Sequence, residues 1–339
     1  MPRLLLPPVI RPVRPAMSQV QKLGGQTMGT GWAVHCAADS PLNTLKLQER
    51  LQARLDEICG QMSHWQADSN LAQFNHAEKN TWQNLPRDFC DVLHCALRAA
   101  HHSQGAYNPA LGQLVNLWGF GPKKRYDSTA FLYPLENEIC NALLHCDYSR
   151  IELDIICCQA RKPEHILLDF SSIAKGYAVD ALAVCLREQN IVHFLIEIGG
   201  ELRGEGFKPD GQPWWVALEI PANASGNSYQ ALEGTLVALH EQSMATSGNY
   251  RHGYSRGGRW LSHTLDPRTG QPLNNGVASV TVIHSSCMVA DVMSTAIMVL
   301  GPERGIEYAR NNQIAAHMVC NTGSQWKEIC SPALLEMCQ

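Results

Sequence analysis

The amino-acid sequence predicts an α+β fold, in which mixed, largely antiparallel sheets pack against helices. Helical and extended segments follow one another in irregular order, and short turns join neighbouring extended segments, unlike a regular βαβ succession. The composition is that of a globular chain, since 45% of the 339 residues are hydrophobic and 17% are charged. A chain of this length can bury a sizeable core.

Periodic apolar residues locate the individual elements. Apolar residues at helical spacing predict helices over residues 44–59, 88–102, 172–189 and 290–300. We expect serine caps to open the third of these helices, and Gly301-Pro302 to end the fourth. Extended, β-rich runs predict strands over residues 31–36, 166–170, 193–198, 214–220, 234–240 and 278–284.

The first twenty residues are expected to be a disordered lead-in. Their apolar run over residues 4–10 is short and contains two prolines, whereas a signal peptide has a longer apolar stretch and a small-residue cleavage site. Met17 is an alternative start. We expect residues 21–339 to form a single domain, with two subdomains as the alternative, in a cytoplasmic protein.

Charge and cysteine content exclude several classes of protein. The formal net charge of −4, without a long basic run, argues against a nucleic-acid partner. Apolar stretches fall short of the roughly 20 residues of a spanning helix, so no membrane partner is expected. Thirteen cysteines are dispersed from Cys36 to Cys338 without C-x-x-C spacing, which is typical of free thiols in a reducing compartment. No Cys/His cluster has the sequence spacing of zinc ligands.

The clearest chemical feature is a carboxylate in an apolar helix. Asp291 is the only charged residue between Cys287 and Leu300. Such a helix is buried, and a buried carboxylate is costly unless it is paired, protonated or bound to metal. Ser294 and Thr295 follow at i+3 and i+4, so their oxygens lie beside it and form a set that suits Mg²⁺. The alternative is that Asp291 caps its helix and Thr295 bonds back to a carbonyl.

A second segment points to phosphate. Asp169 ends an extended run, two serines follow, and Lys175 lies in the first turn of the next helix. Helix N-termini attract phosphate, and a lysine there is unfavourable unless an anion is near. A solvated lysine is the alternative. His263, just before the turn Asp266-Pro-Arg-Thr-Gly270, is a general base, a phosphate contact or a structural histidine.

Taken together and in this order, the segments resemble the FAD:protein FMN transferase family, also called ApbE. The matching blocks are QTMGT (26–30), MSHWQADSNLAQFN (62–75), NPALGQLVNLWGFG (108–121), LDFSSIAKGYAVD (168–180), EIGGELRGEG (197–206), ATSGNYR (245–251), SHTLDPRTGQP (262–272) and ASVTVIHSSCMVADVMSTAIMVLG (278–301). The resemblance implies an ApbE-like fold. It also implies an enzyme that cleaves the FAD pyrophosphate, esterifies FMN onto a Thr or Ser of an acceptor flavoprotein and releases AMP.

The resemblance also implies roles for individual residues. Mg²⁺ would be held by the Asp291 carboxylate, the Thr295 hydroxyl and backbone oxygen around Ser172 and Ser294. His263 would accept the proton of the acceptor hydroxyl. The flavin pocket would use Met28, Trp65, Ala106, Tyr107 and Asn108, and the rest of FAD would contact Asp169, Lys175 and the backbone near Leu265.

The chain departs from the family pattern at a few positions. The family usually has Tyr in place of Trp65 and Asp in place of Asn108 and Asn249, and many relatives are exported lipoproteins, whereas no cysteine precedes Cys36 here. Losing a charge near the flavin bears on the balance between transfer and hydrolysis. A Mg²⁺-dependent FAD pyrophosphatase and a non-catalytic FAD-binding protein are therefore the alternatives.

Overall fold

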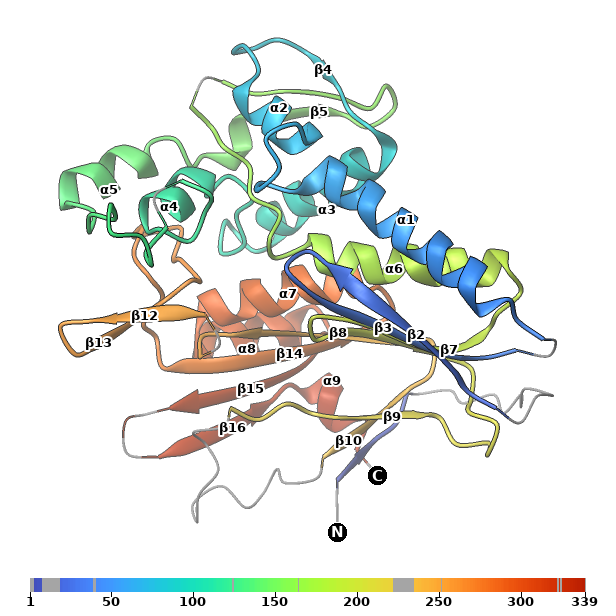
Figure 1. The fold of residues 1–339 in the computed structure, drawn as a ribbon. Helices are drawn as coiled ribbons and strands as arrows, with labels where there is room; N and C mark the ends of the chain where they lie inside the picture. The colour runs from blue at the N-terminus through green and yellow to red at the C-terminus, as the bar shows by residue number, and fades with distance from the viewer. Residues whose placement is uncertain are drawn as a thin grey trace.

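A computed structural model describes residues 3–7, 19–38, 41–123, 125–163, 165–221, 235–250, 252–321, 323 and 325–338. An antiparallel sheet of eight strands runs through the molecule in the order β16-β15-β14-β11-β8-β7-β3-β2 (Figure 1). Its strands, in chain order, are β2 (Gln21–Thr27), β3 (Thr30–Ala37), β7 (His193–Ile198), β8 (Glu201–Glu205), β11 (Gln242–Gly248), β14 (Val277–His284), β15 (Ala315–Asn321) and β16 (Trp326–Cys330). The predicted α+β class with largely antiparallel sheets is confirmed.

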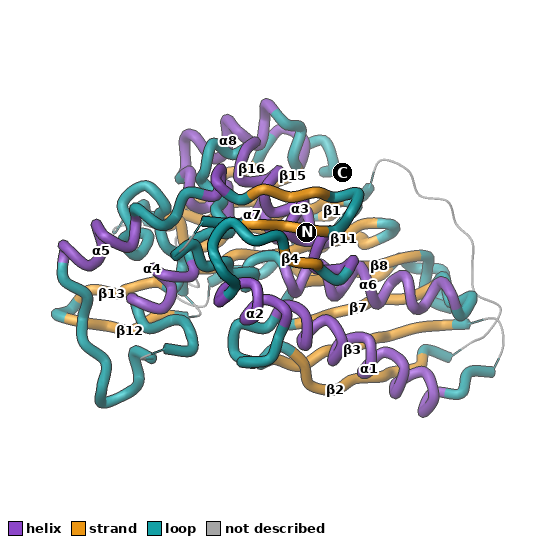
Figure 2. Tube along the Cα trace, turned by 90° about the horizontal axis from the view of Figure 1, so that it is seen from above, coloured by secondary structure: helices purple, strands orange, loops and turns teal. Residues whose placement is uncertain are grey.

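Helices cover one face of this sheet. Helices α1 (Thr44–Met62), α6 (Ala174–Glu188) and α7 (Cys287–Leu300) lie next to one another across it (Figure 2). The remaining helical segments are α2 (Asn70–His76), α3 (Arg87–His102), α4 (Gly112–Leu117), α5 (Glu136–Leu143), η1 (Tyr148–Arg150), α8 (Pro302–Asn311) and α9 (Pro332–Leu335). Strand alternation supplies the apolar face: Phe194, Ile196 and Ile198 of β7 are fully buried in the core beneath α1 and α6.

Three smaller sheets complete the fold. The parallel pair of β1 (Leu4–Leu5) with β10 (Leu236–Leu239) and the antiparallel pair of β10 with β9 (Trp214–Ala217) lie on the face of the large sheet opposite α7 (Figure 1). The other two sheets pair β12 (Gly253–Arg256) with β13 (Arg259–Ser262), and β6 (Gln159–Arg161) with β4 (Gln83–Asn84) and β5 (Glu152–Asp154). None of the helices described in these ranges is long and apolar enough to cross a membrane.

Four predicted helices and most predicted strands are found with small changes of boundary. The strand predicted over residues 166–170 is wrong, although the segment is extended and largely buried. Its backbone bonds are taken by groups outside any strand: the Asn75 side chain accepts from the Leu168 N–H at 2.7 Å and donates to the Leu168 carbonyl at 3.0 Å. The Asp169 N–H donates to the Pro109 carbonyl at 2.8 Å.

Two further expectations need correction. Disorder over residues 1–20 is wrong for Leu4 and Leu5, because both pair with β10 and Leu5 is fully buried. Residues 8–18 of that lead-in, and Gly234 of a predicted strand, lie outside the described residues. Helix α6 begins at Ala174 after Ile173, and no serine side chain caps it.

Candidate active site

Helices α6 and α7 cross in close contact at Gly176. A Cβ atom on this glycine would lie 2.5 Å from the Cys287 carbonyl oxygen and 2.8 Å from Cβ of Asp291. Any larger residue would therefore push the helices apart. This close approach brings the first turn of α6, with Lys175, against the carboxylate of Asp291.

Each of the two helices is capped by a carboxylate of the other. Asp291 of α7 accepts a hydrogen bond from the Gly176 N–H of α6 at 3.0 Å. Asp180 of α6 accepts from the Cys287 and Met288 N–H groups of α7, both at 3.0 Å. Asp291 thus caps a helix N-terminus, but that of α6 and not of its own helix, which Ser286 caps.

Hydroxyl oxygens extend from Asp291 along α7. The Ser294 hydroxyl donates to the Asp291 carbonyl at 2.8 Å. Ser247 of β11 joins the cluster, with its hydroxyl 2.7 Å from that of Ser294 and 2.9 Å from that of Thr295. The alternative in which Thr295 bonds back to a helix carbonyl is therefore not what the structure has. The result is a cluster of three hydroxyl oxygens and the Asp291 carbonyl oxygen on α7 and β11, next to a residue, Asp291, that is 4% exposed.

Lys175 forms an ion pair within this region. Its ammonium lies 2.6 Å from Oε1 of Glu201, whose side chain is 3% exposed and whose Oε2 has no hydrogen-bond partner among the described residues. Burial raises the pKa of Glu201 to about 7 against the opposing effect of Lys175. Burial also raises the pKa of Asp291, which Lys175 and the Gly176 N–H offset in part. Two buried carboxylates thus share one ammonium group, which leaves an excess of negative charge when both are ionised.

Tyr107 connects this centre with the segment before α6. Its ring is 1% exposed, and its hydroxyl lies beside Ser172 without a hydrogen bond of good geometry. Burial raises the pKa of Tyr107 well above its ordinary value, and Asp291 and Asp169 add to the effect through their charge. The Asp169 carboxylate itself accepts from the Ser171 N–H at 2.7 Å. Three predicted residues from two segments, Asp169 and Ser172 before α6 and Asp291 of α7, therefore lie near the Tyr107 phenol.

His263 follows β13, close to Phe120 and His252. Its Nδ1 is 3.0 Å from the His252 carbonyl oxygen, so a neutral ring carries its proton on Nδ1 and leaves Nε2 as the basic nitrogen. Burial lowers the pKa of His263 to about 4, with a further lowering effect from the charge of Lys175. A neutral imidazole near Lys175 can accept a proton at neutral pH.

The residues predicted for the flavin differ in their surroundings. Trp65 is 51% exposed, with the Arg125 guanidinium 5.4 Å from its ring. Met28 has a φ of +47° in the turn between β2 and β3, where Gly29 also has a positive φ. Asn108 donates to the Cys146 carbonyl and accepts from the Ala110 N–H, both at 2.8 Å, so it braces its own loop.

Two predicted residues belong to packed clusters. Ala106 is 5% exposed and belongs to the same apolar cluster as Ala290 of α7. Leu265 is 4% exposed, and its backbone pairs with Pro272 across the predicted turn, in which Asp266 accepts from the Arg268 N–H. The described contacts do not join Trp65 or Met28 directly to the oxygen cluster at Asp291.

Sequence reasoning gave no role to Ser247, Glu201 or Asp180. Glu201 follows Gly199-Gly200, and Ser247 precedes Gly248. In both blocks the glycines drew attention, and the neighbouring side chains were given no role. Only the fold brings Ser247 to Thr295 and Glu201 to Lys175. The one signal in the sequence was a carboxylate, that of Glu201, directly after the Gly-Gly pair.

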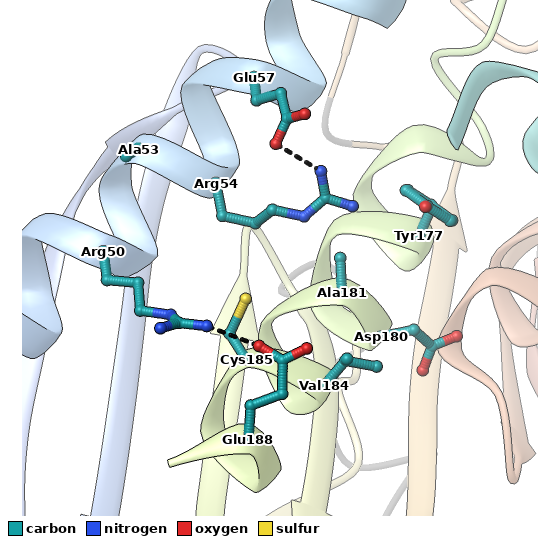
Figure 3. Close-up of a pocket in the computed structure, with 10 residues that line it drawn as sticks. All are labelled: Arg50, Ala53, Arg54, Glu57, Tyr177, Asp180, Ala181, Val184, Cys185 and Glu188. Atoms are coloured by element: carbon teal, nitrogen blue, oxygen red, sulfur yellow. Dashed lines mark hydrogen bonds and ion pairs between the residues drawn. The ribbon is translucent and has the colours of Figure 1, made fainter. Parts of the chain in front are cut away.

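A separate hollow of about 600 Å³ lies on the outer side of α1 and α6 (Figure 3). Both arginines that line it are ion-paired: Arg50 lies 2.6 Å from Glu188, and Arg54 lies 2.7 Å from Glu57. None of the predicted site residues lines this hollow. Its cations are already paired, so we take the crossing of α6 and α7 as the candidate site.

Comparison with known proteins identifies the family of the chain. The model of the ApbE family matches residues 28–318. The chain belongs to the ApbE family. Among curated ApbE relatives, the FAD:protein FMN transferase of Vibrio cholerae is 36% identical over 312 residues, which cover 91% of this chain and 90% of the relative. The corresponding protein of Haemophilus influenzae is 33% identical over 311 residues, with 90% of this chain and 88% of the relative covered.

Solved ApbE structures show the same fold. The apo form of the Pseudomonas stutzeri flavinyl transferase ApbE superposes with a TM-score of 0.84 at 34% identity, covering 94% of this chain and 96% of that chain. The flavin transferase ApbE of Vibrio cholerae gives a TM-score of 0.83 at 33% identity, with coverages of 94% and 99%. The assignment to the ApbE family made from eight sequence blocks is confirmed.

Proposed function

We propose that this chain is a Mg²⁺-dependent FAD:protein FMN transferase. In the reaction the hydroxyl oxygen of an acceptor Thr or Ser bonds to the FMN phosphorus, and the P–O bond to the AMP phosphate breaks. AMP leaves with the electron pair of that bond, and the hydroxyl proton passes to a base. The observation that carries the proposal is the buried Asp291 carboxylate, on the same helix as the Ser294 and Thr295 hydroxyls, in a chain of the ApbE family.

The residues at this centre fit a magnesium ion. All the candidate ligands are oxygens, as Mg²⁺ requires. Of the two carboxylate oxygens of Asp291, only Oδ2 accepts a hydrogen bond among the described residues, from the Gly176 N–H. Burial raises the pKa of both Asp291 and Glu201, so a cation bound beside them would favour their ionised forms. The ligands would be the Asp291 carboxylate, the Thr295 hydroxyl and backbone oxygens at Ser172 and Ser294. Bound there, Mg²⁺ supplies neutralisation of charge on the pyrophosphate oxygens.

Lys175 and Glu201 support the phosphate side of this site. Lys175 projects from the first turn of α6, where the helix dipole also favours an anion. Its pairing with Glu201 fixes the ammonium group at the centre and so prepares it to bind a pyrophosphate oxygen. Asp169 and the backbone at Leu265 would contact the remainder of FAD.

His263 is the base for the acceptor hydroxyl. Its Nδ1–H is held by the His252 carbonyl, so Nε2 is fixed as the accepting nitrogen. The charge of Lys175 acts on the ring, which indicates that His263 lies near the phosphate side of the site.

The flavin would stack on Trp65, in a pocket with Met28 and the segment Ala106-Tyr107-Asn108. Trp65 offers the exposed aromatic face that stacking requires. The acceptor would be a cytoplasmic flavoprotein, a location that the thirteen free cysteines support.

One incubation tests the proposal against its alternatives. The protein is mixed with FAD, Mg²⁺ and a flavoprotein that has a target Thr or Ser. Covalent FMN on the acceptor, with one AMP released for each FMN attached, is the expected result. Free FMN with AMP would instead show a pyrophosphatase, and tight FAD binding without either product would show a carrier.

A further inference from the structure

A second group of potential metal ligands lies on the opposite side of the large sheet. His317 of β15 and Cys330 of β16 are direct partners in the antiparallel register, and Glu328 lies two residues from Cys330 on the same face. One ligand atom from each of these three residues lies within 4.8 Å of the other two. Within the described residues this is the only such group of three His, Cys, Asp or Glu side chains.

The cluster has features of an incomplete coordination shell. His317 is 1% exposed, and neither of its ring nitrogens makes a hydrogen bond of good geometry among the described residues. Its Nε2 nevertheless lies 3.1 Å from Oε1 of Glu328, and the Cys330 sulfur lies 3.2 Å from the same oxygen. A buried imidazole without hydrogen bonds is costly in a structural role, and it faces a carboxylate and a thiol.

We propose that His317, Glu328 and Cys330 form a site for a thiophilic divalent cation of the zinc type, with water as the fourth ligand. Imidazole, thiolate and carboxylate are the ligands that Zn²⁺ takes in proteins. Tetrahedral zinc holds such atoms about 3.4–3.7 Å apart, given Zn–N, Zn–O and Zn–S bonds of about 2.0–2.3 Å. The present separations of 3.1 and 3.2 Å need only small side-chain adjustments to reach that range. Upon binding, the thiol loses its proton to solvent.

Arg3 forms an ion pair with one of the three proposed ligands. Its guanidinium group pairs with Oε1 of Glu328, the same oxygen that His317 and Cys330 approach. A bound cation would compete with Arg3 for this carboxylate. Arg3 adjoins β1, and the backbone of Leu5 pairs with Cys338, so the site joins β15 and β16 to the first and last described segments (Figure 1).

Cobalt provides a probe with a signature for sulfur. The full chain, freed of metal by a chelator and kept in excess Mg²⁺ to occupy the oxygen site, is titrated with Co²⁺. We expect one equivalent to bind with a tetrahedral visible spectrum and a thiolate-to-cobalt charge-transfer band, and one equivalent of Zn²⁺ to remove both. Octahedral cobalt without a charge-transfer band would overturn the proposal.

Variants identify the ligands. Cys330→Ser and His317→Asn should each weaken Zn²⁺ binding by at least about 100-fold, since loss of an outer-shell partner alone costs 10–100-fold. Cys320→Ser is the control: this thiol of the neighbouring strand β15 is buried and faces the core beneath α7 and α8, so Zn²⁺ affinity should not change. An unchanged circular dichroism spectrum and a cooperative thermal unfolding transition show that each variant is folded. If Cys330→Ser and Cys320→Ser bind Zn²⁺ equally well, the assignment fails.

A charge variant supplies an independent check. Arg3→Gln removes the competing guanidinium and should tighten Zn²⁺ binding severalfold. Weaker binding in Arg3→Gln would mean that Arg3 and Glu328 form a structural ion pair which no metal opens, and would contradict the proposal. None of these outcomes depends on FMN transfer being the activity of the chain.

Discussion

Replacing Gly176 by alanine should damage the metal site without touching a ligand. The added Cβ would be 2.5 Å from the Cys287 carbonyl oxygen, about 0.9 Å inside ordinary contact, and the obstacle is backbone that cannot rotate away. Helices α6 and α7 must therefore separate. Their separation stretches the 3.0 Å hydrogen bond from the Gly176 N–H to Asp291.

The cost follows from two effects. Overpacking of this kind costs about 1–3 kcal/mol, and weakening the hydrogen bond to a buried carboxylate costs about 1–3 kcal/mol. The better helix propensity of alanine returns up to about 1 kcal/mol. We expect the free energy of unfolding to fall by about 2–4 kcal/mol. Displacing catalytic groups by nearly 1 Å should lower the transfer rate on the order of 100-fold.

The assay combines thermal unfolding with FMN transfer measured over a series of Mg²⁺ concentrations. Gly176→Ala should need more Mg²⁺ for half-maximal activity. Gly60→Ala is the control, because this glycine also lies in a helix, α1, and no atom would lie within 4 Å of its new Cβ. If both variants keep wild-type stability and Mg²⁺ dependence, the close crossing of α6 and α7 is not required and the reasoning is refuted.

Three further predictions concern individual side chains. Asp291→Asn should abolish Mg²⁺-dependent transfer and the rise in melting temperature with Mg²⁺, yet keep the metal-free stability, because the amide oxygen can still accept from Gly176; activity in this variant would contradict the metal assignment. His263→Ala should lose transfer but keep slow FAD hydrolysis. Burial lowers the pKa of His263 to about 4, so the ring stays neutral near pH 6.5, and its protonation should not lower kcat/KM of the wild type there. Burial raises the pKa of Glu201 to about 7 from 4.5, so the native state holds a proton that the unfolded chain has lost, and metal-free stability should decrease as pH rises between these values. Glu201→Gln should remove this pH dependence in urea unfolding, and an unchanged slope would assign it to another group.

Local sequence patterns predicted much of the fold and the burial of Asp291. Apolar periodicity located α1, α3 and α7, because each helix buries one side or all of its surface. The isolated charge of Asp291 in an apolar segment predicted a buried carboxylate with a compensating partner, and the structure has Asp291 buried against the Gly176 N–H.

Local sequence patterns could not predict contacts between segments that are far apart in the chain. The extended segment over residues 166–170 has the composition of a strand, but Asn75 takes its backbone hydrogen bonds, and no local signal shows this. Likewise Glu201 meets Lys175 only through the pairing of β7 and β8 beside α6. The separation of His317 from Cys330 along the chain resembles no zinc motif, because strand register and not sequence spacing brings them together.

The exchanged caps of α6 and α7 also determine when the site can exist during synthesis. Gly176 and Asp291 are 115 residues apart in the chain, and closing so long a loop precedes any gain from the contact. A nascent chain that ends before α7 has an uncapped α6 and lacks Asp291, the carboxylate proposed to hold the metal. FAD cleavage therefore begins only when translation has passed α7, and shorter products of interrupted synthesis cannot consume the cofactor.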